Sequence, residues 1–316
     1  IIRELVQKID VLVENFRPGT MEKLGLGYDL LKEINPRLIY AASSGFGHTG
    51  PEAKKPAYDM LVQAMGGMIS ITGWPDSPPT RVGMSIGDIT ASLFTAIGIC
   101  SALYQRERTG EGQKIDIGML DCQVAILENA IVRYQVDGVP PQPLGNRHPT
   151  ITPFQAFKAK DDYIIIPVGN NNLWQVFCQA VGREDLIEHE KFATNKLRTE
   201  HLEELIPLLE VEIGQKTVAE WSEIFEQASF PCSPINTIDK VMTNRQLLAR
   251  NMFVQVEDKE IGSVKIVGNP IKMTSIEEET SRPPAPEIGE HTDKILTTFL
   301  GYTNEQITRL REEGVI

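Results

Sequence analysis

The stretch DVLVENFRPGTMEKLGLGYDLLKEINPRLIYAAS, residues 10–43, decides the fold. Residues 10–16 are an apolar run that predicts a strand, and residues 28–34 predict a short helix that an Asn-Pro pair ends. Residues 37–43 are a second apolar run, typical of another strand. A strand, a helix and a strand joined by short connections predict a parallel sheet with helices on its faces.

The same alternation continues toward the middle of the chain. A glycine-rich loop, SGFGHTGP, leads to a predicted helix at residues 58–66, and a long helix is predicted at residues 88–106. A strand with period-two patterning at residues 114–119 and a helix at residues 121–135 follow. We therefore predict an α/β fold with a large domain built on a Rossmann-like parallel sheet.

Two stretches rich in proline suggest where the chain crosses between domains. The expected division is a large domain at residues 1–136, a linker at 137–153, a smaller α+β domain at 154–272 and a C-terminal return to the large domain at 273–316. Residue 1 lies in a predicted helix that runs straight into the first strand, so we expect the protein to have an upstream N-terminal segment.

Composition excludes several classes of partner. The net charge of −12 argues against nucleic acid and anionic membrane surfaces, because both attract basic proteins. The longest uncharged run, residues 89–104, is shorter than the ~20 residues that span a bilayer and predicts a buried core helix. The 4 cysteines form no Cys-x-x-Cys pair, which predicts buried free thiols in a reducing compartment such as the cytoplasm. The histidines have no metal-ligand spacing, so no metal site is predicted.

Asp88 is the first candidate for chemistry, because it ends the sequence GMSIGD at the predicted start of the long helix. An Asp before an apolar helix is most often an N-cap. The same place suits a nucleophile, because the positive end of the helix dipole would lower the pKa of the carboxyl group. Gly87 would let a substrate approach closely. The residues alone leave both roles open.

A second group of candidates lies at the carboxyl end of the first predicted strand, where open α/β sheets bind ligands. Asn15, Phe16 and Arg17 follow that strand directly. Arg17 and Lys23 could pair with phosphate groups. The alternative is that both are solvated surface charges.

Taken together, these segments resemble the family III CoA-transferases, which include formyl-CoA and carnitine CoA-transferases and, as a related member, alpha-methylacyl-CoA racemase. The resemblance runs through the whole chain in order and is carried by residues 13–31, 34–51, 58–67, 83–88, 109–121, 145–157 and 285–292. The motifs at residues 169–172 and 195–198 are most similar to transferases that use succinyl-CoA and a dicarboxylate.

The resemblance implies a catalytic role for Asp88, whose carboxylate would attack the donor thioester and become an aspartyl-CoA thioester. It implies that Asn15, Phe16, Arg17 and Lys23 contact the nucleotide part of CoA and that Tyr58 lies near the pantetheine and the thioester. Coenzyme A would be a substrate, with no permanently bound cofactor and no metal. The partners expected are an acyl-CoA and a small carboxylate.

Gly145, Arg147 and His148 match a loop that covers the active site in relatives. Formyl-CoA transferase has a run of glycines there, so the basic pair of this chain is a candidate binding site for an acceptor carboxylate. The racemase has a histidine where this chain has Tyr58, which favours transfer over racemisation; a racemase and a non-catalytic CoA-binding protein remain as alternatives. The resemblance also implies an interlocked homodimer, in the cytoplasm or, in a eukaryote, in mitochondria.

Overall fold

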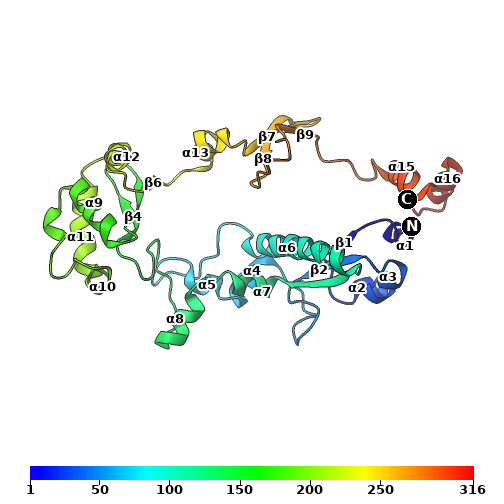
Figure 1. Cartoon of the computed structure of the whole chain (residues 1–316), viewed down its shortest axis with the longest axis horizontal. Helices are drawn as coiled ribbons and strands as arrows, with labels where there is room; N and C mark the ends of the chain where they lie inside the picture. The colour runs from blue at the N-terminus through cyan, green and yellow to red at the C-terminus, as the bar shows by residue number, and fades with distance from the viewer. The chain divides into compact units, whose positions relative to one another are not determined.

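The computed structural model describes residues 1–316 and divides into two compact units. Unit 1 consists of residues 1–145 and 292–316, and unit 2 of residues 146–291 (Figure 1). The break at residue 145 lies within the proline-rich stretch 137–153.

Unit 1 is built on a three-stranded parallel sheet in the order β1-β2-β3. Its strands are β1 (Val11–Glu14), β2 (Ile39–Ser44) and β3 (Gln113–Gly118). Every residue of β2 is buried, because this strand is flanked by a strand on each side and covered by helices. The parallel sheet predicted from the alternation of strands and helices is confirmed.

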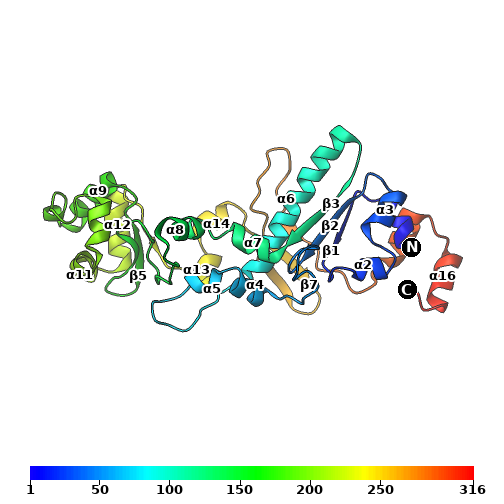
Figure 2. The same ribbon diagram turned by 90° about the horizontal axis from the view of Figure 1, so that it is seen from below.

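Helices surround this sheet. The N-terminal half of unit 1 contains α1 (Ile2–Val6), α2 (Thr20–Lys23), α3 (Tyr28–Ile34), α4 (Asp59–Met65), α5 (Met68–Ile71), α6 (Ile86–Thr109), α7 (Met119–Ala125) and α8 (Ala130–Asp137). Helix α6 packs along β2 and β3 (Figure 2). Gly98 allows this close approach, because a Cβ there would lie 3.1 Å from Ile115 Cγ2.

The end of the chain returns to unit 1 as α15 (Thr292–Ile295), the π-helical turn η2 (Leu296–Leu300) and α16 (Asn304–Glu312). η2 contacts α1, and the Tyr302 hydroxyl donates a hydrogen bond to Glu4 at 3.0 Å. This contact joins the first and last segments of the chain.

Three expectations about helices in unit 1 are wrong. The helix predicted at 121–135 is interrupted between α7 and α8, where Glu128 has a φ of 54° that breaks helical geometry. Helix α6 begins at Ile86 with Ser85 as its N-cap, so Asp88 lies inside the first turn and is not the cap. The helix is also not a buried core helix, because only 28% of its most apolar stretch is buried. α6 is the one helix long and apolar enough to cross a membrane, which is weak support for a span because helices of soluble proteins pass the same test.

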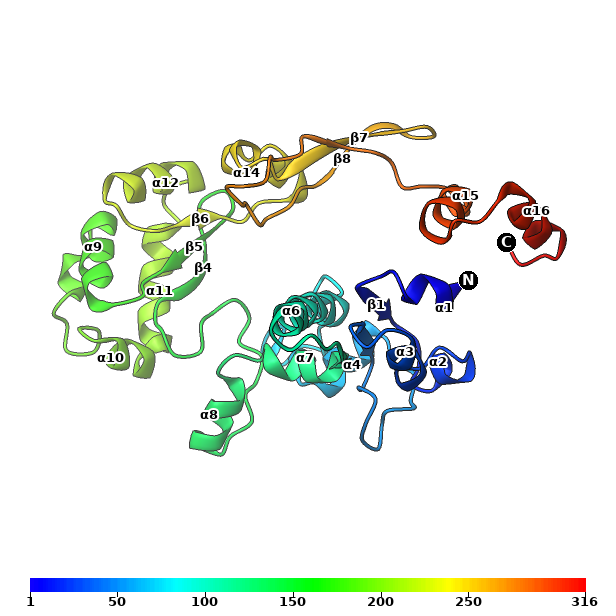
Figure 3. The same cartoon turned by 45° about the vertical axis from the view of Figure 1, so that its right-hand side comes forward.

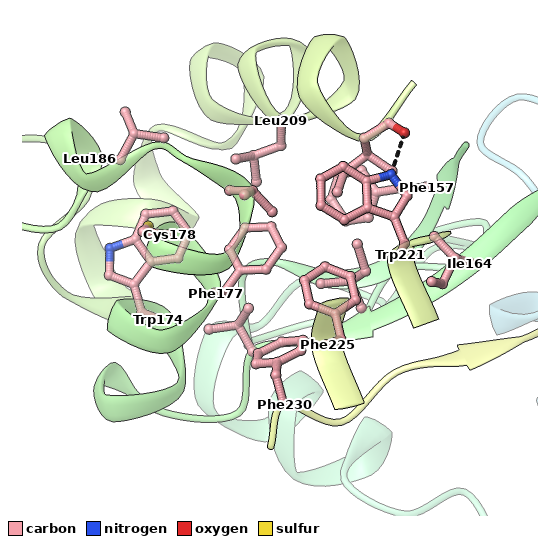
Figure 4. Close-up of a cluster of buried hydrophobic side chains, with 14 of the residues drawn as sticks. Phe157, Ile164, Trp174, Phe177, Cys178, Leu186, Leu209, Trp221, Phe225 and Phe230 are labelled. Carbon is pink, nitrogen blue, oxygen red and sulfur yellow. Dashed lines mark hydrogen bonds between the residues drawn. The ribbon is translucent and has the colours of Figure 1, made fainter. Parts of the chain in front are cut away.

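Unit 2 begins with an antiparallel sheet of β4 (Phe154–Lys158), β5 (Tyr163–Pro167) and β6 (Ser233–Pro234). Helices pack with this sheet around one hydrophobic core (Figures 3 and 4): α9 (Asn171–Val181), η1 (Glu184–Leu186), α10 (Asn195–Glu200), α11 (Leu202–Ile213) and α12 (Val218–Gln227). Its centre is aromatic, with Phe177 stacked on Trp174 and Phe225. The indole of Trp221 donates a hydrogen bond to the Ile213 carbonyl at 2.7 Å, which satisfies its buried N–H (Figure 4).

The rest of unit 2 contains α13 (Ile238–Met242), α14 (Arg245–Ala249) and a second sheet of β7 (Phe253–Asp258), β8 (Gly262–Val267) and β9 (Ser281–Arg282). β7 pairs antiparallel with β8 and parallel with β9. The boundary expected after residue 272 lies between β8 and β9, and the compact unit extends to His291.

Candidate active site

A cavity of about 170 Å³ lies at the carboxyl ends of β1 and β2. It is lined by Asn15, Phe16, Arg17, Pro18, Ser44, Gly45, Lys55, Pro56, Ala57, Tyr58 and Met119. The structure thus brings Asn15, Phe16, Arg17 and Tyr58 together at the edge of the sheet where α/β proteins bind ligands. Lys23 lies exposed at the end of α2 and does not line this cavity.

Local hydrogen bonds explain how the loop after β1 reaches this place. The buried carboxylate of Glu14, the last residue of β1, accepts a hydrogen bond from the Phe16 N–H at 2.7 Å. Gly19 adopts a φ of 89° and starts α2, a conformation that favours glycine. The aromatic side chains of Phe16 and Tyr58 remain 53% and 77% exposed. Large exposed aromatic groups beside a cavity are suited to packing against a ligand.

A cluster of ionisable side chains around the buried Glu14 lies near this edge and was not found from the sequence. His48 Nδ1 is 3.0 Å from Lys114 Nζ, and His48 Nε2 is 3.5 Å from Glu14 Oε1. Because an ammonium group only donates, Nδ1 accepts and the ring proton lies on Nε2, facing Glu14. Asp116 accepts the His48 backbone N–H at 2.9 Å. The cluster ties β1 to β3 across the sheet, beside a second cavity of about 530 Å³. Only spatial proximity connects these residues, so no local motif could have identified them.

Asp88 lies in the first turn of α6, on its exposed side. Partial burial of its carboxyl group and then the negative charge of Asp59 raise the pKa of Asp88 above its usual value. The expectation that the helix N-terminus lowers this pKa is therefore wrong, because desolvation and a neighbouring carboxylate outweigh the helix dipole. The result is a more basic carboxylate at the surface of unit 1.

Asp59, which the sequence did not mark, contacts the turn that carries Asp88. Its Oδ1 accepts a hydrogen bond from the Gly87 N–H at 2.8 Å. A Cβ on Gly87 would lie 2.7 Å from Val62 Cγ2 and 3.0 Å from Asp59 Oδ1. Glycine is therefore needed for the close approach of α4 to α6, which is a structural reason for a residue first assigned to substrate access.

The loop residues Gly145, Arg147 and His148 fall on both sides of the boundary between the units. Gly145 belongs to unit 1, where its N–H donates to the Gly73 carbonyl at 2.8 Å and its backbone packs against Trp74. In unit 2, His148 Nδ1 accepts from the Ile151 N–H at 3.1 Å, and its ring stacks on Phe154. One nitrogen of His148 is thus used to shape the loop itself.

The 195–198 motif supports the next part of this loop. The fully buried Arg198 donates from Nε to the Thr152 carbonyl at 2.7 Å and from Nη1 to the Phe192 carbonyl at 3.0 Å, and its guanidinium lies over the Trp174 ring. Burial lowers the pKa of Arg198 to about 10. Asn195 accepts the Thr152 N–H at 3.0 Å. The motif therefore fixes the backbone of the loop from inside unit 2.

The cysteines are all free thiols, but the expectation that all are buried is wrong. Cys122 and Cys178 are buried, and burial raises the pKa of Cys178 to about 12. Cys100 is exposed on α6 and Cys232 is partly buried. No group of three or more His, Cys, Asp or Glu side chains could hold a metal ion.

Comparison with known proteins places this arrangement in a family. The family model of CoA-transferase family III matches residues 1–292. The acetyl-CoA:oxalate CoA-transferase of Acetobacter aceti is 42% identical over 291 residues, which are 92% of this chain and 74% of the relative. The succinyl-CoA:glutarate CoA-transferase of Mus musculus is 34% identical over 316 residues, covering 100% of this chain and 72% of the relative.

A solved structure agrees with the sequence comparisons. The crystal structure of a CAIB/BAIF family protein from Brucella suis superposes with a TM-score of 0.80 at 36% identity, covering 94% of this chain and 77% of that one. The α/β fold class and the resemblance stated from the motifs are both confirmed. The chain belongs to CoA-transferase family III and is an enzyme that transfers coenzyme A between carboxylic acids.

Proposed function

We propose that the protein moves CoA from succinyl-CoA, or a similar short acyl-CoA, to a small carboxylic acid through a covalent intermediate on Asp88. The observation that carries this proposal is the exposed Asp88 carboxyl group with its raised pKa, held in the first turn of α6 beside Asp59. Relatives named as succinyl-CoA-dependent transferases, among them the glutarate and D-citramalate enzymes, support this class of donor.

The proposed reaction begins when the Asp88 carboxylate attacks the thioester carbonyl of the donor. The C–S bond breaks, CoA leaves as a thiolate, and an aspartyl acyl anhydride forms. The thiolate then attacks the Asp88 carbonyl, which releases the donor acid as its carboxylate and leaves an aspartyl-CoA thioester. The acceptor carboxylate attacks this thioester, which releases the CoA thiolate and forms a second anhydride between Asp88 and the acceptor. The thiolate then attacks the acyl carbonyl of the acceptor, which forms the new acyl-CoA and releases the Asp88 carboxylate. Covalent catalysis divides one difficult exchange into easier steps, and a more basic carboxylate is the better nucleophile.

We assign CoA binding to Asn15, Phe16, Arg17 and Tyr58, with Lys23 as a further charged contact. The support is that the first four line one cavity at the carboxyl ends of the strands. Arg17 can pair with a phosphate group, and Phe16 offers an exposed ring for the adenine. A cavity of about 170 Å³ holds only a part of CoA, so the rest of the substrate extends along the surface.

We assign the acceptor carboxylate to the loop of Gly145, Arg147 and His148. One ring nitrogen of His148 is used within the loop, so Arg147 is the side chain whose fork of donors can match a carboxylate. Gly145 has a φ of 67°, which gives the loop a left-handed turn just before these residues.

A homodimer is also part of the proposal. Ile89, Leu93 and Ile97 follow one another at intervals of four residues on α6 and are 42%, 59% and 59% exposed. Apolar side chains at this spacing form one stripe on a helix, and an exposed stripe favours burial against another surface. We propose that a second copy of the chain covers it, in the interlocked arrangement implied by the family resemblance. The cytoplasm, or the mitochondrion of a eukaryote, suits a chain whose four cysteines are free thiols.

The test uses the purified protein, succinyl-CoA and a panel of free carboxylates. Mass spectrometry follows new acyl-CoA products and the mass of a CoA adduct on the peptide that contains Asp88. We expect a new acyl-CoA with at least one acceptor and an adduct that is absent from Asp88→Asn. Transfer by the Asn variant at the wild-type rate contradicts the proposal. Exchange of the alpha proton of a 2-methylacyl-CoA with deuterated solvent, without transfer, would instead assign the chain to racemisation.

A further inference from the structure

Two fully buried glutamines lie on either side of the turn that carries Asp88. Gln63 comes from α4 and Gln123 from α7, and neither side chain is exposed. A buried amide costs free energy unless its groups are hydrogen-bonded. The partners of these two amides therefore show what the glutamines hold in place.

Gln63 links the segment before α6 to Asp59 on α4. Its Nε2 donates to Asp59 Oδ2 at 2.7 Å, and its Oε1 accepts from the Val82 N–H at 3.1 Å. Asp59, oriented by this contact, accepts the Gly87 N–H through its other oxygen at 2.8 Å. One chain of hydrogen bonds thus joins Val82, in the segment before α6, to Gln63 and Asp59 on α4 and then to Gly87, the residue before Asp88.

Gln123 holds the other side of the same turn. Its Nε2 donates to Thr90 Oγ1 at 3.1 Å and to the Ile86 carbonyl at 3.4 Å, so it contacts residues on both sides of Asp88. Its Oε1 is buried without a hydrogen-bond partner. An unpaired buried acceptor costs free energy, so an apolar side chain of the same size is expected to raise the thermal midpoint.

We propose that Gln63 and Gln123 are positioning residues that hold the first turn of α6 between them and so fix the Asp88 carboxylate for attack on the thioester. The inference rests on the proposed role of Asp88. Residues 86–90 form the backbone that sets the direction of the Asp88 side chain. Gln123 reaches this backbone directly from α7, and Gln63 reaches it through Asp59 on α4. A displacement of about 1 Å in a reacting group can cost about 100-fold in rate, so small movements of this turn matter.

The chain offers a matched pair of residues for the experiment. Thr90 and Thr95 are both buried on α6, and the hydroxyl of each donates to the carbonyl four residues earlier at 2.7 Å. Thr90 also accepts from Gln123, and Thr95 has no such contact. Thr90→Val and Thr95→Val therefore both remove the hydrogen bond to the carbonyl four residues earlier, and only the former also removes the contact with α7 and a longer contact of 3.2 Å with the Gly87 carbonyl.

Gln123→Met, Gln63→Met, Thr90→Val and Thr95→Val are compared with the wild type in kcat, KM for succinyl-CoA, thermal midpoint and the rate at which the CoA adduct appears. We expect Gln123→Met and Thr90→Val to lower kcat and the adduct rate about tenfold, with KM within about twofold. Gln123→Met should melt at or above the wild-type temperature, and the double variant Gln123→Met/Thr90→Val should lose no more activity than either of these single variants. Thr95→Val should keep wild-type kcat.

The outcomes separate this inference from the proposal about Asp88. If wild-type protein forms no adduct on Asp88, the proposed mechanism fails and this inference fails with it. If the wild type forms the adduct and all four variants keep kcat and the adduct rate within about twofold, only the positioning role is overturned. A loss of kcat in Thr95→Val equal to that in Thr90→Val would also overturn it. Should Gln63→Met fail to fold, Gln123→Met and the threonine pair still decide the question.

Discussion

The two units differ in how they bury their side chains. In unit 2, residues 157–230 form one continuous core with aromatic rings at its centre, and the buried Arg198 has a partner at each donating nitrogen. Unit 1 has two smaller hydrophobic clusters and exposes large apolar side chains at the cavity beside β1 and along α6. Side chains are thus more densely buried in the aromatic core of unit 2 than around the candidate site of unit 1.

Buried polar atoms show the same contrast. The buried side-chain atoms without a hydrogen bond lie in unit 1 with one exception, Trp174 Nε1. Those of unit 1 are Tyr40 Oη, Ser44 Oγ, Gln123 Oε1 and Arg133 Nε, together with His48 Nε2, Glu52 Oε2 and Arg106 Nε, which have only ion-pair contacts with Glu14, Lys55 and Glu107. Functional sites often retain such imperfections, because a site shaped for chemistry is not optimised for stability. The comparison predicts that changes around Asp88 in unit 1 alter activity and that changes in the aromatic core of unit 2 alter folding.

The sharpest test of this comparison is Asp88→Asn in unit 1. We expect transfer to fall by more than about 1000-fold, because removing a nucleophile removes the covalent route. The folded-state pKa of Asp88 is raised, so its ionisation disfavours folding as the pH rises through this range. The Asn variant should therefore be no less stable at neutral pH, as thermal denaturation would show. A large drop in the melting temperature together with the lost activity would weaken the contrast.

Phe225→Ala in unit 2 should have the opposite profile. Phe225 is fully buried and stacks on Phe177 and Trp221, so the change leaves a cavity that costs about 3–5 kcal/mol of unfolding free energy. Chemical denaturation measures this loss. Where the variant remains folded, its binding of CoA should match the wild type, because the assigned CoA contacts lie in unit 1. A loss of unfolding free energy below about 1 kcal/mol would contradict close packing around Phe225.

Arg198→Met tests the polar side of the unit 2 core. The change leaves the carbonyls of Thr152 and Phe192 without donors, which should cost about 2 kcal/mol even though a buried charge is removed. Limited proteolysis should then cut the loop of residues 145–152 faster than in the wild type. Arg198→Lys is the control that keeps the charge and loses the planar fork, and it should give an intermediate effect. Equal proteolysis of all three proteins would refute the supporting role.

Asp59→Asn tests, within unit 1, whether Asp59 sets the pKa of Asp88; the measurement is the pH dependence of kcat/KM. Asp88 attacks as a carboxylate, so activity falls as the pH drops through its pKa. Burial and the charge of Asp59 raise the pKa of Asp88, and Asn removes the second cause. The acid limb should therefore move to lower pH. Asp59 is the only charged group that acts on Asp88; the side chains that face this turn from α4 and α7, Gln63 and Gln123, are neutral. An unmoved acid limb would show that Asp59 does not tune the nucleophile.

The smallest effect on folding is expected for Ile97→Glu on the exposed face of α6. Ile97 is 59% exposed, so the substitution should change the stability of a single chain by no more than about 0.5 kcal/mol. A buried charge would nevertheless disrupt a dimer, which sedimentation velocity would detect as a shift to lower mass. Lys294→Glu is a surface control outside this face; it changes the charge in the same direction and by a larger step. A monomeric wild type would remove the homodimer from the proposal.

Many of the strands and helices of unit 1 could be predicted from the local sequence pattern. The strands of the parallel sheet and both ends of α3 follow from apolar runs bounded by turn residues, because such signals depend on neighbours in sequence. The break at Glu128 was missed, since helical and left-handed conformations of one residue are decided by its packing. Asp88 was found through its motif, although its pKa direction was not.

The sequence by itself determined the α/β alternation, the family and the candidate nucleophile, because each is encoded in short contiguous segments. Only the tertiary structure decided what surrounds Asp88 and what supports the loop of residues 145–152. Asp59, Gly87 and Gln123 lie far apart along the chain and meet where α4, α6 and α7 pack. Arg198 becomes a buried support because α10 packs against the loop at Thr152. Desolvation and hydrogen bonding depend on which groups are close in space, and sequence pattern does not contain those distances.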